Sequence, residues 1–157
     1  MKSLETILDF ELPATSGQRF ILSTMKGAPL VLYFYPKDDT PGCTDEGLQF
    51  AALYPEFAKL KCTILGISRD SIASHEKFRT KMNFPFHLLS DSSETACQIF
   101  NVIHPKNMFG KQVMGIQRST FLISPNNEIW AAWRGVSVPG HAQEVLDKLI
   151  QITNERN

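Results

Sequence analysis

An apolar run that stops at a proline and is soon followed by a helix-start signal constrains this fold most. Residues 30–35 read Leu-Val-Leu-Tyr-Phe-Tyr, and Pro36 ends the run. Near-continuous apolar character indicates a strand buried on both faces, as in the middle of a parallel or mixed sheet. Thr40 and Pro41 then predict the start of a helix, with the Thr40 hydroxyl capping its free N–H groups.

Cys43 occupies the third position of that helix, just past the end of the strand. The first N–H groups of a helix have no intrahelical partner, and the helix dipole places positive potential there. We therefore expect the Cys43 thiol to ionise more readily than a free thiol and to be reactive. The carboxyl end of a central strand is also where open α/β sheets bind ligands.

The rest of the chain alternates strand and helix patterns. Short alternating runs at 9–12 and 18–22 predict an N-terminal hairpin. Further strands are expected at 62–67, 84–89, 116–123 and 128–133, and helices at 41–59, 71–82, 91–100 and from 140 onward. Pro55 should kink or interrupt the first helix, and residues 101–115 should form a loop or a weak hairpin arm. We expect one α/β domain over residues 1–157, with a central mixed sheet covered by helices on both faces.

Charge and cysteine content exclude several classes of function. Sixteen basic and sixteen acidic residues leave a formal net charge of zero, so nothing favours nucleic acid or an anionic membrane as a partner. No apolar stretch approaches the roughly 20 residues of a membrane helix. The first ten residues carry acids where a signal peptide has its apolar core. Three sparse cysteines fit a reducing compartment, and we expect a cytoplasmic protein.

Other cysteine chemistries fit this chain poorly. A thioredoxin-type dithiol needs a second cysteine where Glu46 stands, and a zinc site needs closely spaced ligand pairs. A cysteine hydrolase needs a histidine base, and none of the histidines has a local signature. We expect structural or surface roles for all four histidines, which are His75, His87, His104 and His141. Cys62 opens an apolar strand and should belong to the core.

Fast thiol chemistry also needs groups that stabilise the leaving group. Thr40 and the N–H groups of Gly42 and Cys43 can supply some hydrogen-bond donors. A cation from elsewhere is still required, and Arg118 at the head of a core strand is a candidate. The alternative interpretation of Arg118 is a solvated charge at a strand end.

The spacing of Pro36, Thr40 and Cys43 matches the peroxiredoxin active-site motif, and residues 9–149 resemble the peroxiredoxin Q (bacterioferritin comigratory protein) subfamily. Matching stretches also occur at 31–38, 43–46, 66–71, 86–91, 118–123 and 140–142. The resemblance implies a thioredoxin-like fold and a monomer without metal or other cofactor. It also implies a thiol-dependent peroxidase that reduces hydrogen peroxide and organic hydroperoxides.

Roles for individual residues follow from the resemblance by position. Cys43 would be the peroxidatic nucleophile, which attacks the terminal peroxide oxygen and becomes sulfenic acid. Thr40 would hydrogen-bond the sulfur and the peroxide, and Arg118 would stabilise the thiolate and the departing oxygen. Pro36 would shield the pocket, and Glu46 would orient the arginine.

The chain departs from the subfamily in its resolving cysteine. Many members carry this cysteine where Leu48 stands here, others carry it in the next long helix, and residues 72–82 contain none. Some thiol must reduce the sulfenic acid. We predict a one-cysteine enzyme that uses thioredoxin, glutaredoxin or a low-molecular-weight thiol. In the alternative, Cys97 resolves Cys43 in a two-cysteine mechanism. The opposing interpretation of Cys97 is a half-buried helix residue without a role in the reaction.

Two other functions stay open on the same fold. The first is a peroxide sensor or holdase, in which oxidised Cys43 signals instead of turning over. The second is a catalytically silent binding module. The set of Thr40, Cys43 and Arg118 argues against a silent module, because binding alone needs none of this chemistry.

Overall fold

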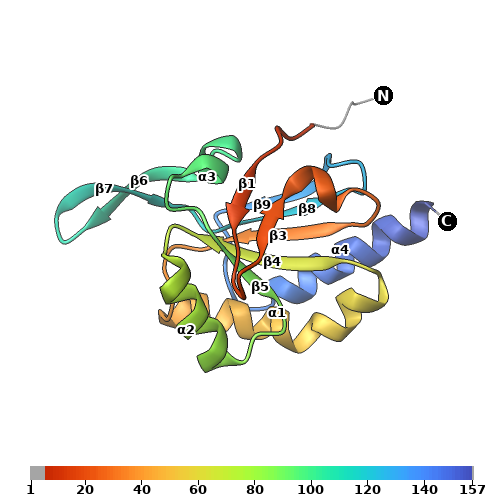
Figure 1. The fold of residues 1–157 in the computed structure, drawn as a ribbon, viewed down its shortest axis with the longest axis horizontal. Helices are drawn as coiled ribbons and strands as arrows, with labels where there is room; N and C mark the ends of the chain where they lie inside the picture. The colour runs from red at the N-terminus through yellow and green to blue at the C-terminus, as the bar shows by residue number, and fades with distance from the viewer. Residues whose placement is uncertain (1–5, 157) are drawn as a thin grey trace.

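The computed structural model describes residues 6–156, so the ends of the predicted domain, residues 1–5 and 157, lie outside the described residues (Figure 1). A five-stranded mixed sheet with the strand order β5-β4-β3-β8-β9 lies at the centre. Its strands are β3 (Leu30–Phe34), β4 (Thr63–Ser68), β5 (His87–Ser90), β8 (Ser119–Ile123) and β9 (Ile129–Arg134). The first three run parallel, and β8 is antiparallel to both β3 and β9. The predicted buried strand is therefore the central one.

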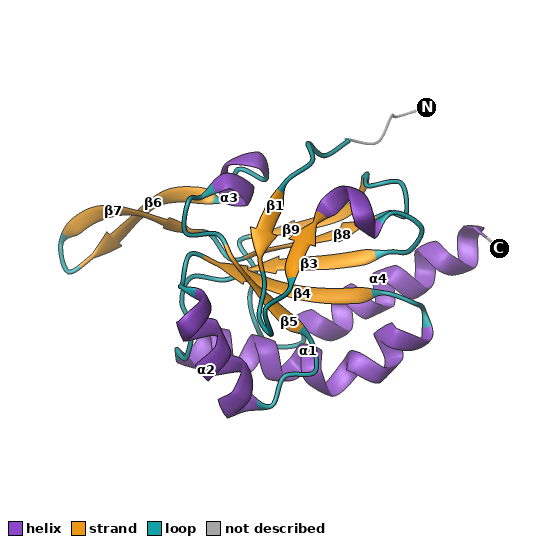
Figure 2. Cartoon of the chain, in the orientation of Figure 1, coloured by secondary structure: helices purple, strands orange, loops and turns teal. Residues whose placement is uncertain are grey.

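Helices cover the two faces unequally, as Figure 2 shows. On one face lie α1 (Pro41–Lys59), α2 (Ile72–Met82) and α4 (His141–Arg156). On the other lie α3 (Thr95–Ile99), the predicted hairpin β1 (Glu11–Pro13) and β2 (Arg19–Ile21), and the 3-10 helix η1 (Leu22–Met25). Each face has its own aromatic core: Phe50 and Phe57 lie beneath the long helices, whereas Phe20 and Phe100 lie beneath the hairpin and α3.

Residues 103–116 form a hairpin that projects from the body of the molecule (Figure 1). Its strands are β6 (Ile103–Met108) and β7 (Lys111–Ile116). A loop and a hairpin arm were the two predicted alternatives, and the segment forms the hairpin arm. The strand predicted over 116–123 is divided, because Ile116 ends β7 and β8 starts only at Ser119. Arg118 therefore lies in the break between two sheets.

Pro55 does not interrupt α1, because the helix is continuous from Pro41 to Lys59, and a kink at Pro55 stays a prediction. Phe50 and Phe57, on either side of the proline, are both completely buried. Their packing against the sheet holds the helix together across the hydrogen bond that a proline cannot make. Within residues 6–156, no helix has both the length and the apolar content needed to cross a membrane.

Candidate active site

Cys43 lies where the sequence predicted it, in the first turn of α1. The helix starts at Pro41 with Thr40 as its N-cap residue, so Cys43 is the third helical residue. Its side chain is only 2% exposed and belongs to the core cluster that also contains Tyr33 and Phe50. The sulfur is thus held among apolar groups at the positive end of a long helix.

The Thr40 hydroxyl does not cap the helix, which corrects the sequence-based expectation. It donates to the carbonyl oxygen of Lys37 at 2.8 Å, and in the described chain no side chain accepts from the first amides of α1. The loop folds back so that this carbonyl is the nearer partner. The amides of Gly42 and Cys43 are therefore not used by a competing side-chain oxygen. A hydrogen bond from Thr40 to the sulfur requires the hydroxyl to rotate, and this role stays a prediction.

Arg118 contacts both the sulfur and a buried carboxylate. Its Nη2 donates to Cys43 Sγ at 3.4 Å, and its Nη1 donates to Glu46 Oε1 at 2.7 Å. Burial acts to lower the pKa of Arg118, but Glu46 and Cys43 outweigh burial and raise it. The guanidinium is therefore a fixed cation at the sulfur, and the alternative of a solvated strand-end charge was wrong.

Glu46 lies one turn after Cys43 and is 1% exposed. Burial raises its pKa to about 7, although the charge and hydrogen bond of Arg118 act in the opposite direction. Oε1 is paired with the guanidinium, whereas Oε2 has no hydrogen-bond partner among the described residues. The carboxyl group thus both orients the arginine and changes its own charge near neutral pH.

Of the two remaining predicted residues, Gly42 lies beside this group. A Cβ atom on Gly42 would be 3.1 Å from Arg118 Nη2, so the missing side chain leaves room for the guanidinium. Pro36 is partly buried and follows β3 closely in the chain. Shielding of the pocket by Pro36 stays a prediction.

Cys97 and Cys62 have different surroundings. Cys97 lies in α3, is 0% exposed and belongs to the core on the face of the sheet opposite to Cys43. Burial raises the pKa of Cys97, and the neighbouring carboxylate of Asp91 raises it further. Cys62 is buried as predicted, and its burial raises the pKa to about 12. All three cysteines are free thiols. Cys97 is fully rather than half buried.

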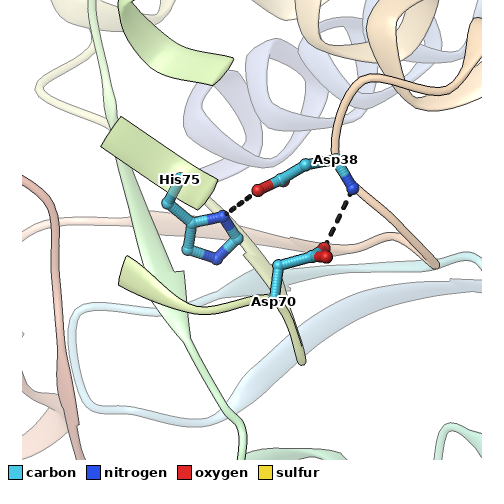
Figure 3. Close-up of side chains that lie close together, drawn as sticks. All are labelled: Asp38, Asp70 and His75. Atoms are coloured by element: carbon cyan, nitrogen blue, oxygen red, sulfur yellow. Dashed lines mark hydrogen bonds and ion pairs between the residues drawn. The ribbon is translucent and has the colours of Figure 1, made fainter. Parts of the chain in front are cut away.

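A buried polar network beside the site was not predicted. Asp38, in the loop between β3 and α1, bonds with Tyr35 and with His75 of α2. His75 does have the structural role expected of it, but its link to this loop is not visible in the sequence pattern. The ligand-type atoms of Asp38, Asp70 and His75 lie within 4.8 Å of one another (Figure 3). Hydrogen bonds within the protein already use them, so the group is a polar network rather than an open metal site.

The comparisons with known proteins agree with this geometry. Residues 4–132 match the AhpC/TSA family. The chain belongs to this family. As a peroxiredoxin it is a thiol-dependent peroxidase with a thioredoxin-like fold, and its reaction uses a peroxide and a thiol reductant.

Similar proteins place it in the peroxiredoxin Q (Bcp) group. Peroxiredoxin Bcp of Xanthomonas campestris is 54% identical over 141 residues, which cover 90% of this chain and 88% of the relative. Peroxiredoxin Bcp of Bacillus subtilis is 45% identical, with 90% of each chain covered. A solved structure of the Xanthomonas campestris bacterioferritin comigratory protein, described for its alkyl peroxide reduction activity, superposes with a TM-score of 0.87 at 52% identity. That match covers 90% of each chain. The resemblance that the motif indicated is therefore confirmed.

Proposed function

We propose that Cys43 is the peroxidatic cysteine of this peroxiredoxin. Its thiolate attacks the terminal oxygen of the peroxide, the O–O bond breaks, and the other oxygen leaves with a proton as water or an alcohol. Cys43 becomes sulfenic acid. One observation carries the proposal: the Arg118 guanidinium lies 3.4 Å from Cys43 Sγ and is held there by Glu46.

Each group around the sulfur has a role in this step. Arg118 places a positive charge at the sulfur before the reaction and stabilises negative charge on the departing oxygen during it. The free amides at the start of α1 add positive potential that the folded structure fixes in advance. Thr40 would donate to the peroxide after its hydroxyl leaves the carbonyl of Lys37. The guanidinium and the amides are fixed before the substrate binds, so they need little reorganisation during the reaction.

We also propose the one-cysteine mechanism. An external thiol attacks the sulfenic acid, releases water and forms a mixed disulfide, which a second thiol then reduces. Cys97 is an unfavourable resolving residue, because it is buried on the other face of the sheet and its pKa is raised. Thioredoxin, glutaredoxin and low-molecular-weight thiols are the candidate reductants, and hydrogen peroxide and organic hydroperoxides the candidate substrates.

Peroxide consumption by the wild type and by Cys97→Ser, with each reductant in turn, tests this mechanism. We expect continuous turnover with at least one reductant and the same rate for both proteins within about twofold, since a residue outside the reaction contributes little to the barrier. An abundant Cys43–Cys97 crosslink in mass spectra after stoichiometric peroxide would show the two-cysteine mechanism instead. A stall after one equivalent of peroxide with every reductant would favour the sensor.

We propose that residues 1–157 form one peroxiredoxin domain, and the family match over residues 4–132 supports this. A cytoplasmic location and a monomeric state stay predictions.

A further inference from the structure

A buried hydrogen-bond network holds the loop that leads into Cys43 (Figure 3). Asp38 lies in this loop and is 7% exposed. Its Oδ1 accepts from the Tyr35 hydroxyl at 2.6 Å, and its Oδ2 accepts from the Ser74 hydroxyl at 2.7 Å. The same Oδ2 lies 2.7 Å from Nδ1 of His75. The network thus joins the loop to α2.

The two ring nitrogens of His75 both face hydrogen-bond acceptors. Nδ1 faces the carboxylate of Asp38, and Nε2 lies 2.8 Å from the carbonyl oxygen of Leu89 on β5. A carbonyl oxygen can only accept, and a neutral imidazole has a single N–H group. A neutral ring next to a carboxylate would therefore present a lone pair to one of the two oxygens. While Asp38 is ionised, only the doubly protonated ring satisfies both contacts.

A protonated Asp38 that donates to a neutral His75 is the alternative, and the other contacts of Asp38 disfavour it. This carboxyl group already accepts from Tyr35 and Ser74, as an ionised group does. Burial acts to raise the pKa of Asp38, but the hydrogen bond and charge of His75 and the two hydroxyl donors together lower it. The shared proton therefore belongs to the ring. Asp38 and Tyr35 are the titratable groups in contact with the ring, and Asp70 lies next to Asp38.

We propose that the imidazolium of His75 and the carboxylate of Asp38 form a positioning pair that fixes the loop before Cys43. The pair acts through the loop and does not touch the reacting atoms. Its effect on catalysis rests on the proposed function, whereas its charge state does not. A second hydrogen bond holds the same residue: the Asp38 N–H donates to Oδ2 of Asp70 at 2.9 Å. The loop is thus joined through Asp70 to the end of β4 and through His75 to β5.

The loop backbone also includes a residue in the left-handed region. Asp39 has a φ of 58°, in the left-handed region that side chains rarely adopt. Its carboxylate also pairs with Lys81 of α2 at 2.9 Å, but that pair is exposed and contributes little. Cys43 follows only four residues later. A misplacement of about 1 Å in a reacting group can cost about 100-fold in rate.

Nuclear magnetic resonance of the ¹⁵N-labelled full chain tests the charge state. We expect both ring nitrogens of His75 to be protonated at pH 7.5, with the signals assigned by their loss in His75→Gln. In Asp38→Asn the ring should lose one proton, because its counter-ion is gone. A wild-type spectrum with one unprotonated nitrogen would overturn the proposal.

Single-turnover oxidation of Cys43 by hydrogen peroxide tests the positioning. We expect His75→Gln and Asp38→Asn each to slow oxidation by about 10- to 100-fold, and the double variant to be no slower than the slower single variant. His87→Gln is the matched control, since His87 of β5 is half-buried and bonds Thr15 instead. Its rate should stay within about twofold of the wild type. Wild-type rates in both single variants would overturn the positioning role.

A milder variant covers the case in which His75→Gln fails to fold. Ser74→Ala removes one donor to Asp38 and should slow oxidation by about two- to fivefold, since Tyr35 and His75 still hold the carboxylate. An unchanged rate in this folded variant would contradict the proposal. A doubly protonated ring in a protein whose Cys43 reacts no faster than free cysteine would overturn the proposed function and, with it, the positioning role. The charge state of the pair would then still stand.

Discussion

Cys43 and Cys97 occupy the same kind of position and differ in what faces them. Each is the third residue of a helix, and each is buried, at 2% and 0% exposure. At α1, Arg118 donates to the sulfur. At α3, the carboxylate of Asp91 accepts from the N–H groups of Ala96 and Cys97 at 3.1 and 2.7 Å.

The difference shows that a helix start does not by itself make a thiol reactive. Burial raises the pKa of Cys97, and Asp91 raises it further, because it uses the free amides of α3 and places a negative charge where a thiolate would form. At α1 the Thr40 hydroxyl bonds the carbonyl of Lys37, and a cation approaches instead of an anion. Reactivity therefore depends on the charge that the tertiary fold brings to each helix start.

The largest effect should separate the two cysteines directly. Replacing the nucleophile removes the chemistry, so Cys43→Ser should lower peroxidase activity by at least about 10³-fold. Cys97→Ser should stay within about twofold of the wild type. Steady-state peroxide consumption measures both, with circular dichroism to show that the variants are folded. Substantial activity in Cys43→Ser would mean that the site is assigned to the wrong residue.

A second variant removes the feature that only Cys43 has. In Arg118→Lys a compact ammonium cannot reach both the sulfur and Glu46 as the forked guanidinium does. We expect a loss of about 100-fold in kcat/KM for peroxide, as for removal of one preorganised donor. Arg134→Lys is the control, because Arg134 is exposed and lies over Phe121 instead. Equal effects of the two replacements would contradict a special role for Arg118.

The buried carboxylate near Cys43 gives a pH-dependent effect on stability. Burial raises the pKa of Glu46 from its ordinary value of 4.5 to about 7, so the folded state binds this proton more tightly than the unfolded chain. Its stabilising contribution is complete below pH 4.5 and is lost as the pH rises through about 7. From pH 5 to pH 8 the wild type should lose about 2 kcal/mol relative to Glu46→Gln.

Urea unfolding of both proteins at the two pH values measures this difference. The exposed neighbour Asp45 supplies the control. The free energy of unfolding of Asp45→Asn should change between the two pH values as much as that of the wild type. If the free energy of unfolding of Glu46→Gln also changes as much as that of the wild type, the carboxyl group is ionised throughout and the account of Glu46 is wrong.

The smallest expected effect concerns α3, the helix that contains Cys97. Asp91→Ala removes the side chain that caps α3, so it should lower the free energy of unfolding by about 1 kcal/mol. Peroxidase activity should stay within about twofold, because α3 lies on the other face of the sheet. A loss of activity as large as that of Arg118→Lys would show that Cys97 takes part in the reaction.

The sequence predicted the parts of the fold and site that depend on local pattern. The apolar run became β3, Thr40 became the N-cap residue of α1, and α2 spans Ile72–Met82, close to the predicted 71–82. Arg118 was placed correctly because the family motif, and not its spacing alone, pointed to it. These features depend on hydrophobic periodicity, cap chemistry and a specific motif.

What could not be predicted depends on contacts between distant segments. Whether the Thr40 hydroxyl turns to an amide or to a carbonyl depends on how the preceding loop folds. The link between Asp38 and His75 joins residues 37 positions apart. The β6–β7 hairpin contains Pro105 and two exposed methionines, Met108 and Met114, so its alternation is weak and its pairing only becomes evident in the structure.

The most direct test of the central claim compares the oxidation of the three cysteines in one protein. The wild type would be mixed with hydrogen peroxide for increasing times and quenched with a sulfenic-acid probe, and the labelled residues would be quantified by mass spectrometry. We predict that Cys43 is labelled first and in proportion to peroxide, while Cys62 and Cys97 stay unlabelled. Labelling of Cys97 as fast as Cys43 would contradict the claim that the charge facing each thiol determines its reactivity.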